Sequence, residues 1–171
     1  MSSDYLRTPS LVAEPLRLDH LAFLVSLHSD ATTMATNGGI RTPQQTEQYL
    51  EINLRHWREH GFGLWIFRDQ ATGEPVGRGG PRYVILEDRR EVEVAYTVHA
   101  CFWGRGYATE MGRLSLAVAA KNGLANLVAF TLPENKRSRR VMEKIGFKYG
   151  REILHLGLTM VLYAQNVTSE A

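Results

Sequence analysis

The stretch that most constrains the fold of this chain is residues 91–110, EVEVAYTVHACFWGRGYATE. Residues 91–99 place valine and tyrosine on one side and mostly polar side chains on the other, which is the period of a β-strand. Two glycines, Gly104 and Gly106, follow this segment, and residues at helical spacing then continue to Gly123. The sequence therefore predicts a strand, a glycine loop and a helix in direct succession.

This order of elements is suited to binding a phosphate or pyrophosphate. A glycine loop at a helix N-terminus offers unpaired N–H groups and the positive end of the helix dipole. An ordinary loop explains the two glycines equally well, because glycine pairs are common in turns. The chain has neither the three spaced glycines of the dinucleotide fingerprint nor a Gly-Lys-Ser/Thr sequence. The usual nucleotide-binding loops are therefore excluded.

Length and composition predict a single domain, residues 1–171, of ordinary soluble type. The chain is 44% hydrophobic and 22% charged, and its formal charge of +2 is too small to indicate a nucleic-acid or membrane partner. Cys101 is the only cysteine, which excludes an internal disulfide and favours a reducing compartment. No apolar segment resembles a signal core or a membrane span. We therefore expect a cytoplasmic protein with neither of these partners.

Periodicity in the rest of the chain predicts an α/β fold with about seven strands and about four helices. A first strand is expected near residues 10–15, and a loop at residues 29–41 separates two helices. Thr42 and Gln45 have the spacing of a capping box at the start of the second helix. The glycines of residues 76–87 predict a strand with a bulge or an edge position.

Three histidines are candidate metal ligands. His56 and His60 have the spacing of a helical metal pair, but no third ligand is apparent, so a solvated helix face is the better interpretation. We expect His28 to be a packed or rim residue. The sequence therefore predicts no metal site.

A basic segment begins the helix expected at residues 136–145, after Asn135 as its N-cap. Cations at a helix N-terminus cost up to about 1 kcal/mol each, so they need compensation. One candidate for the compensating negative charge is Glu143, at helical spacing from Arg139 and Arg140. The other is a nearby nucleotide phosphate. The basic residues are Lys136, Arg137, Arg139 and Arg140.

Four blocks of sequence carry a resemblance to a known family. They are HGFGLWIFRDQATGEPVG, EVEVAYTV, FWGRGYATE and PENKRSRRVMEKIGF. In this order and spacing, the chain resembles the GNAT superfamily of acetyl-CoA-dependent N-acetyltransferases over nearly its whole length. The last two blocks are most similar to the subgroup of ribosomal-protein alanine N-acetyltransferases, some antibiotic-modifying enzymes and some polyamine acetyltransferases. The resemblance implies a mixed, mostly antiparallel central sheet of about seven strands flanked by about four helices.

The resemblance also implies acetyl-CoA as the cosubstrate, without a metal. In the family, amides of the glycine loop hold the pyrophosphate, and the preceding strand pairs its backbone with the pantetheine arm. A core strand and a helix cap are the purely structural interpretations of the same residues. The residues that the resemblance assigns to acetyl-CoA are Tyr96, Thr97, Val98, Trp103, Gly104, Arg105, Gly106, Tyr107, Ala108, Thr109 and Asn135.

The implied reaction is direct attack of a neutral amine on the thioester. A peptide α-amine loses its proton at pH 7 for about 1.4 kcal/mol, and a lysine side chain for about 4.6 kcal/mol, so a modest base suffices for the first. Glu93 is the candidate base, and Glu91 on the same strand face is the alternative. Either can instead be a surface carboxylate that balances Arg82, Arg89 or Arg90.

The leaving thiolate is protonated in many family members by a tyrosine, but the matching residue here is Met142. Ser138, one turn earlier, is the candidate substitute, and its structural alternative is hydrogen bonding at the helix start. Cys101 lacks a histidine positioned to activate it, so we expect it to be packed. Met142 favours the alternative function of a non-catalytic acyl-CoA-binding regulatory module.

The acceptor is expected to be a primary amine, on a small molecule or a protein N-terminus. The segments expected to shape its site are the loop at residues 29–41, the strand that holds Trp65 and the final pair of strands. Family members often dimerise, so the resemblance allows a homodimer.

Overall fold

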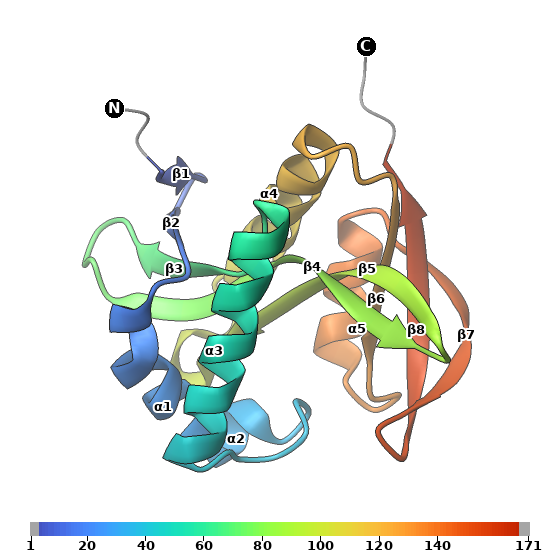
Figure 1. The fold of residues 1–171 in the computed structure, drawn as a ribbon, viewed down its shortest axis with the longest axis horizontal. Coiled ribbons are helices and arrows are strands. Elements are labelled where there is room, and N and C mark those ends of the chain that lie inside the picture. The colour runs from blue at the N-terminus through green and yellow to red at the C-terminus, as the bar shows by residue number, and fades with distance from the viewer. Residues whose placement is uncertain (1–3, 168–171) are drawn as a thin grey trace.

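A computed structural model describes residues 4–167 and places one eight-stranded sheet between helices (Figure 1). The strand order is β1-β2-β3-β4-β5-β6-β8-β7, and every neighbouring pair is antiparallel except β5 and β6. The strands are β1 (Leu6–Arg7), β2 (Leu11–Pro15), β3 (Trp65–Asp69), β4 (Pro75–Leu86), β5 (Arg89–Val98), β6 (Asn126–Thr131), β7 (Lys148–His155) and β8 (Leu158–Asn166).

The helices cover both faces of this sheet. Leucines of α1 and α3 pack with Leu64, Ile66 and Ala95 on one face, whereas α4 packs with Phe67 and Val98 on the other. The helices are α1 (Leu21–Ser29), α2 (Ala31–Met34), α3 (Pro43–His60), α4 (Tyr107–Lys121) and α5 (Lys136–Lys144), with 3₁₀ turns η1 (Leu18–His20) and η2 (Ala100–Phe102).

The predicted fold class is confirmed, with small differences in the number of elements. The structure adds the two-residue strand β1, and it forms the short helix α2 inside the segment expected to be a loop. The capping box at the start of α3 is present, since Thr42 Oγ1 accepts from the Gln45 N–H at 3.1 Å and Gln45 Oε1 accepts from the Thr42 N–H at 2.9 Å. Local chemistry therefore fixes this helix start as expected.

Of the two alternatives predicted for the glycine-rich strand β4, the edge position is wrong and the bulge is present. β4 lies inside the sheet, between β3 and β5, and its register against β3 shifts at Val76, because Phe67 pairs with Gly77 whereas Arg68 pairs with Pro75. Its glycines are required because the β5 backbone lies very close. A Cβ on Gly77 would lie 2.3 Å from the Thr97 carbonyl oxygen, and one on Gly79 would lie 2.7 Å from the Ala95 oxygen.

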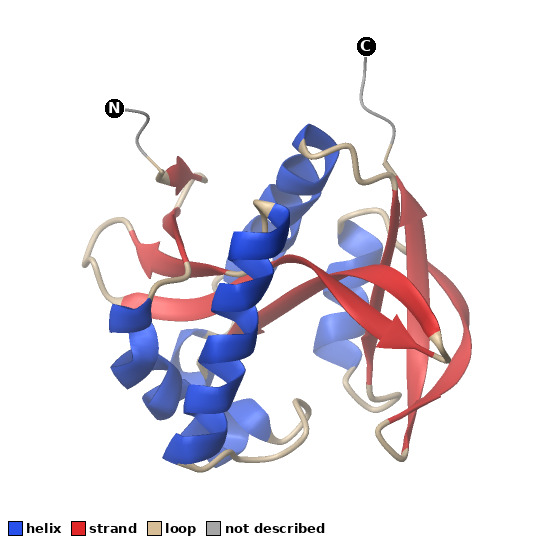
Figure 2. Ribbon diagram, viewed as in Figure 1, coloured by secondary structure: helices blue, strands red, loops and turns tan. Residues whose placement is uncertain are grey.

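The sheet separates between β5 and β6. These parallel strands pair only at Val92 with Leu127 and at Glu93 with Val128, although β5 continues to Val98 and β6 to Thr131. Figure 2 shows the strands β1–β5 and β6–β8 running in different directions beyond this point. The separation exposes one backbone edge of β5 next to the start of α4.

Candidate active site

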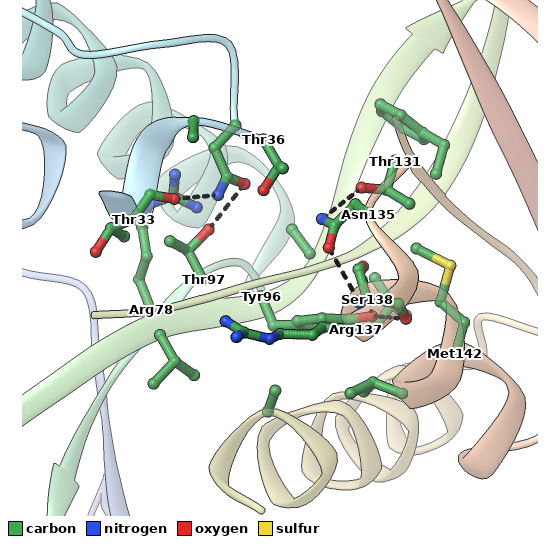
Figure 3. Close-up of a pocket in the computed structure, with 18 of the residues that line it drawn as sticks. Thr33, Thr36, Arg78, Tyr96, Thr97, Thr131, Asn135, Arg137, Ser138 and Met142 are labelled. Atoms are coloured by element: carbon green, nitrogen blue, oxygen red, sulfur yellow. Dashed lines mark hydrogen bonds between the residues drawn. The ribbon is translucent and has the colours of Figure 1, made fainter. Parts of the chain in front are cut away.

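The separation of β5 and β6 forms a cavity of about 1340 Å³, which we call the cleft (Figure 3). Its walls come from α2 and the loop after it, α3, β4, β5, the starts of α4 and α5, the end of β6 and the β7–β8 turn. Typical small-ligand pockets measure about 300–1,000 Å³. The cleft is therefore large enough for a cofactor and an acceptor together.

The backbone of β5 presents free groups to the cleft. The His99 N–H donates to the Val76 oxygen at 2.9 Å, so the alternating backbone directs the N–H groups of Tyr96 and Val98 away from β4 and toward the cleft. The Val98 oxygen accepts from Trp103 Nε1 at 2.8 Å. By the same alternation, the Thr97 N–H faces β4, and it is the Thr97 side chain that lines the cleft.

The glycine loop ends in an uncapped helix start. Gly104 and Gly106 have φ values of 80° and 79°, in the left-handed region that glycine adopts readily, and Gly106 is the N-cap of α4 without a side chain that could cap it. Within residues 4–167, the N–H groups of Tyr107, Ala108 and Thr109 have no protein acceptor. Three donors and the positive helix end therefore face the cleft, which suits an anion.

The side chains of this segment mostly support the loop. The Tyr107 hydroxyl donates to Asp69, and this hydrogen bond raises the pKa of Tyr107 and lowers that of Asp69. The Arg105 guanidinium lies 5.2 Å from the Phe102 ring centroid. Trp103 is 37% exposed, and the Arg137 guanidinium lies 4.3 Å from its ring centroid. Trp103 and Arg137 thus bring the glycine loop and the basic start of α5 together.

Glu93 lies inside the cleft and is only 7% exposed. Its Oε2 accepts from Arg82 Nε at 2.9 Å, which is the one hydrogen bond of this carboxylate in the described part of the chain. The surface position considered for Glu93 is therefore wrong, but the pairing with Arg82 is present. Glu91 faces Val84 of β4 and does not line the cleft.

On the opposite face of β5, the Tyr96 side chain reaches the start of α5 (Figure 3). Its hydroxyl lies 3.0 Å from Ser138 Oγ and 3.0 Å from the Ser138 backbone oxygen. Burial raises the pKa of Tyr96, so the phenol is neutral at physiological pH. Sequence reasoning considered only the backbone of Tyr96, because its side chain occupies an ordinary apolar position in the strand pattern.

Two other residues, the N-cap of α5 and Met142 near its end, have structural roles. Asn135 Oδ1 accepts from the Ser138 N–H at 3.2 Å, and Asn135 Nδ2 donates to Thr131 Oγ1 at 2.9 Å, so Asn135 is the expected cap. Met142, at the family's tyrosine position, is 2% exposed and belongs to the hydrophobic core beside α5.

The expected pairing of Glu143 with an arginine is not present among residues 4–167. Tyr163 separates the two charges, since its hydroxyl accepts from Arg139 Nε at 3.0 Å and donates to Glu143 Oε1 at 3.3 Å. Arg139 also donates to the Pro133 oxygen at 3.0 Å. The other basic residues of this segment line the cleft, and they are Lys136, Arg137 and Arg140.

Two expectations outside the cleft are corrected. His56 is not on a solvated face, because its Nδ1 donates to the Phe62 oxygen at 2.9 Å and its Nε2 accepts from the Tyr83 N–H at 3.0 Å. Cys101 is exposed in η2 rather than packed. The structure from residue 4 to residue 167 has no cluster of three potential metal ligands, and no helix there has the length and apolarity of a membrane span.

Comparison with known proteins decides the family. Residues 10–148 match the model of the acetyltransferase (GNAT) domain. The chain belongs to the GNAT acetyltransferase family. The predicted family is therefore confirmed, and the cleft is the candidate active site of this GNAT protein.

Individual GNAT relatives extend over nearly the whole chain. The uncharacterized protein YkkB of Bacillus subtilis (strain 168) is 30% identical over 160 residues, which cover 90% of this chain and 93% of YkkB. An acetyltransferase from Agrobacterium tumefaciens str. C58 has a TM-score of 0.82 at 24% identity, covering 96% of this chain and 95% of its own.

A ribosomal-protein acetyltransferase is also among the structural neighbours. RimL, a ribosomal L7/L12 α-N-protein acetyltransferase in complex with coenzyme A, has a TM-score of 0.79 at 14% identity, covering 97% of this chain and 99% of its own. RimL acts on a ribosomal protein, as do some enzymes of the subgroup that the sequence resembles. At such identity the likeness concerns the fold.

Proposed function

We propose that this GNAT protein transfers the acetyl group of acetyl-CoA to a primary amine, carried by a small molecule or a protein N-terminus. The observation that supports this most is the open edge of β5 beside the uncapped start of α4. An extended pantetheine arm can add to that edge as a strand would, while the diphosphate meets the helix N-terminus. No other part of the described chain combines these two features.

The residues of the cleft fit acetyl-CoA at both ends. The N–H groups of Tyr107, Ala108 and Thr109 would hold the diphosphate, because charged acceptors contribute about 1.5–3 kcal/mol per hydrogen bond. The N–H groups of Tyr96 and Val98 would hold the arm or the acetyl oxygen. Gly104 and Gly106 keep the approach open, since a Cβ on either would meet nothing within 4 Å.

The proposed reaction divides between the two faces of β5. The amine nitrogen attacks the thioester carbon, and Glu93 Oε1 takes the proton that the nitrogen loses, directly or through a water. The carbon–sulfur bond then breaks, and the thiolate takes a proton from the hydrogen-bonded pair of Tyr96 and Ser138. Arg82 orients the Glu93 carboxylate for this role.

The experiment measures thiol release from acetyl-CoA with a panel of amines, for the wild type, Glu93→Gln and Glu91→Gln. We expect Glu93→Gln to lower kcat about 100- to 10,000-fold, as loss of a general base does, with acetyl-CoA affinity retained. Glu91→Gln is the matched control outside the cleft and should stay within about threefold of the wild type. Full activity of Glu93→Gln would remove Glu93 from the mechanism.

The alternative function has a distinct result in the same assay. A non-catalytic acyl-CoA-binding regulatory module would bind acetyl-CoA but acetylate no amine in the panel. The burial of Met142 at the family's tyrosine position is the observation that favours this alternative. Measuring acetyl-CoA binding by calorimetry beside the turnover assay separates the two functions.

A further inference from the structure

The acceptor side of the cleft holds three arginines around one aromatic ring. The guanidinium carbons of Arg78, Arg41 and Arg82 lie 4.7, 5.2 and 5.7 Å from the ring centroid of Tyr49. All three arginines and Tyr49 line the cleft. Arg78 and Arg82 share a sheet face with Glu93, because Arg78 is the register partner of Thr97 and Arg82 that of Glu93.

These positive charges exceed the negative charge beside them. Glu93 is the carboxylate paired with the cluster, and it binds Arg82. Arg78 donates through Nε to His28 Nε2 at 3.0 Å, but burial and the nearby charges of Arg78 and Arg41 lower the pKa of His28 to about 3. His28 is therefore neutral and supplies neither a further cation nor a countercharge.

Two guanidinium groups keep donors without partners. Arg41 Nη1 is buried, and it has no hydrogen-bond partner among residues 4–167. Arg78 is 4% exposed, and its side chain makes one hydrogen bond within residues 4–167, to His28. Burial lowers the pKa of Arg78 to about 10, so the side chain remains charged at neutral pH. A buried charge without an acceptor for its donors is costly, so these two arginines favour an anionic ligand.

We infer that the acceptor amine carries an oxyanion, a carboxylate or a phosphate, which binds Arg41 and Arg78 while the amine faces Glu93. Guanidinium groups present paired N–H donors that match either oxyanion. The arrangement would orient the acceptor by its two ends, with the anion at Tyr49 and the nucleophile at the base. This inference rests on the proposed acetyl transfer, whose acceptor it specifies.

The first arm of the test uses acceptors that differ only in the anion. Free L-amino acids are compared with their amides, and phosphoethanolamine with ethanolamine, at saturating acetyl-CoA. We expect kcat/KM of at least one anionic acceptor to exceed that of its neutral partner about tenfold or more. A neighbouring anion favours protonation of the amine, so intrinsic reactivity favours the neutral partner and the preference must come from the protein. The two series distinguish a carboxylate from a phosphate.

Variants of Arg41 connect this preference to the cluster. Arg41→Gln should move the anionic-to-neutral ratio of kcat/KM toward one by raising KM for the anionic acceptor, and Arg41→Lys should retain part of the preference. Arg55→Gln removes one charge from an exposed position of α3 and should keep the wild-type ratio. Equal use of anionic and neutral amines by the wild type would overturn the inference and leave acetyl transfer standing.

The second arm measures binding without turnover. Inorganic phosphate or acetate is titrated into protein saturated with coenzyme A, so that the diphosphate site is filled. We expect at least one of these anions to bind the wild type and to lose affinity in Arg41→Gln but not in Arg55→Gln. Oxyanion binding without acetylation of any amine would contradict the proposed function but not this site. Absence of oxyanion binding to the wild type would overturn the inference even if amines are acetylated.

Discussion

Glu93 and Tyr96 show how a single strand can serve two steps of one reaction. Alternation along β5 directs Glu93 toward the arginine cluster and Tyr96 toward α5. The alternation was visible in the sequence, and it predicted that Glu93 lies on the face opposite the valines. It did not predict that Arg82 would hold the carboxylate inside the cleft rather than on the surface.

The arginine cluster could not be predicted from sequence for a physical reason. Arg41 comes from a loop, Tyr49 from α3 and Arg78 from β4, and each looks like an ordinary residue of its own segment. Their proximity depends on how α3 packs across the sheet. The His28 side chain that accepts from Arg78 was expected only to be packed or at a rim, and no local signal indicated its partner.

Substitution of Tyr96 tests the proton donor. Tyr96→Phe removes the hydroxyl that pairs with Ser138, and we expect kcat to fall about 10- to 100-fold. The loss should be moderate because a thiolate is a fair leaving group and depends only partly on a proton donor. Ser138→Ala should have a smaller effect in the same direction. The measurement is thiol release at saturating substrates.

The control for this prediction is Tyr83→Phe, since Tyr83 is a half-buried tyrosine of β4 that does not line the cleft. If Tyr96→Phe and Tyr83→Phe reduce kcat equally, packing rather than proton donation explains the loss.

His28 predicts a dependence of stability on pH. Its pKa falls from 6.5 to about 3 on folding, because the ring is 0% exposed and lies near two guanidinium groups. The unfolded chain therefore binds the extra proton, so this contribution to stability is full above pH 6.5 and is lost as the pH falls toward 3. The slope approaches about 1.4 kcal/mol per pH unit.

Urea unfolding of the wild type and His28→Gln at several pH values between 7 and about 4.5 measures this contribution. The glutamine retains an acceptor for Arg78 but does not titrate. The free energies of unfolding should therefore converge as the pH falls. Parallel curves for the two proteins would show that His28 does not titrate on unfolding in this range.

At the scale of elements, the strand, glycine loop and helix of residues 91–121 were predictable because each depends on neighbouring residues in the chain. The opening between β5 and β6 was not. It arises because β5 and β6 pair at only two positions, and these strands are separated in the sequence by the whole of α4. The central position of β4 was also missed, because glycines required by a close neighbouring strand resemble those of an irregular edge.

Two glycines that flank α4 provide a matched test of the glycine loop. Gly106 and Gly123 have φ values of 79° and 71°, and a Cβ on either would meet nothing within 4 Å. Alanine at either position should cost a similar 1 kcal/mol or so of stability through backbone strain. Only Gly106→Ala should weaken acetyl-CoA binding, by about 10- to 100-fold, as hydrogen bonds to the diphosphate are misaligned.

Calorimetric titration with acetyl-CoA and urea unfolding measure the two effects separately. Equal acetyl-CoA affinity in Gly106→Ala and Gly123→Ala would show that the start of α4 does not hold the cosubstrate.

At the scale of the molecule, the sheet works as two parts that meet at β5 and β6. The part from β1 to β5 supplies the open backbone edge, Glu93 and two of the arginines, whereas β6 and the hairpin of β7 and β8 close the other wall of the cleft. The fold class was predictable from the order of patterns along the chain. The cleft needed the arrangement of segments that are distant in sequence.

The most direct measurement is a crystal structure of the protein with acetyl-CoA. The account predicts that the diphosphate accepts hydrogen bonds from the N–H groups at residues 107–109, and that the thioester lies beside the β5 backbone at residues 96–98, between Glu93 and Tyr96. Acetyl-CoA bound elsewhere, with these N–H groups left free, would contradict it.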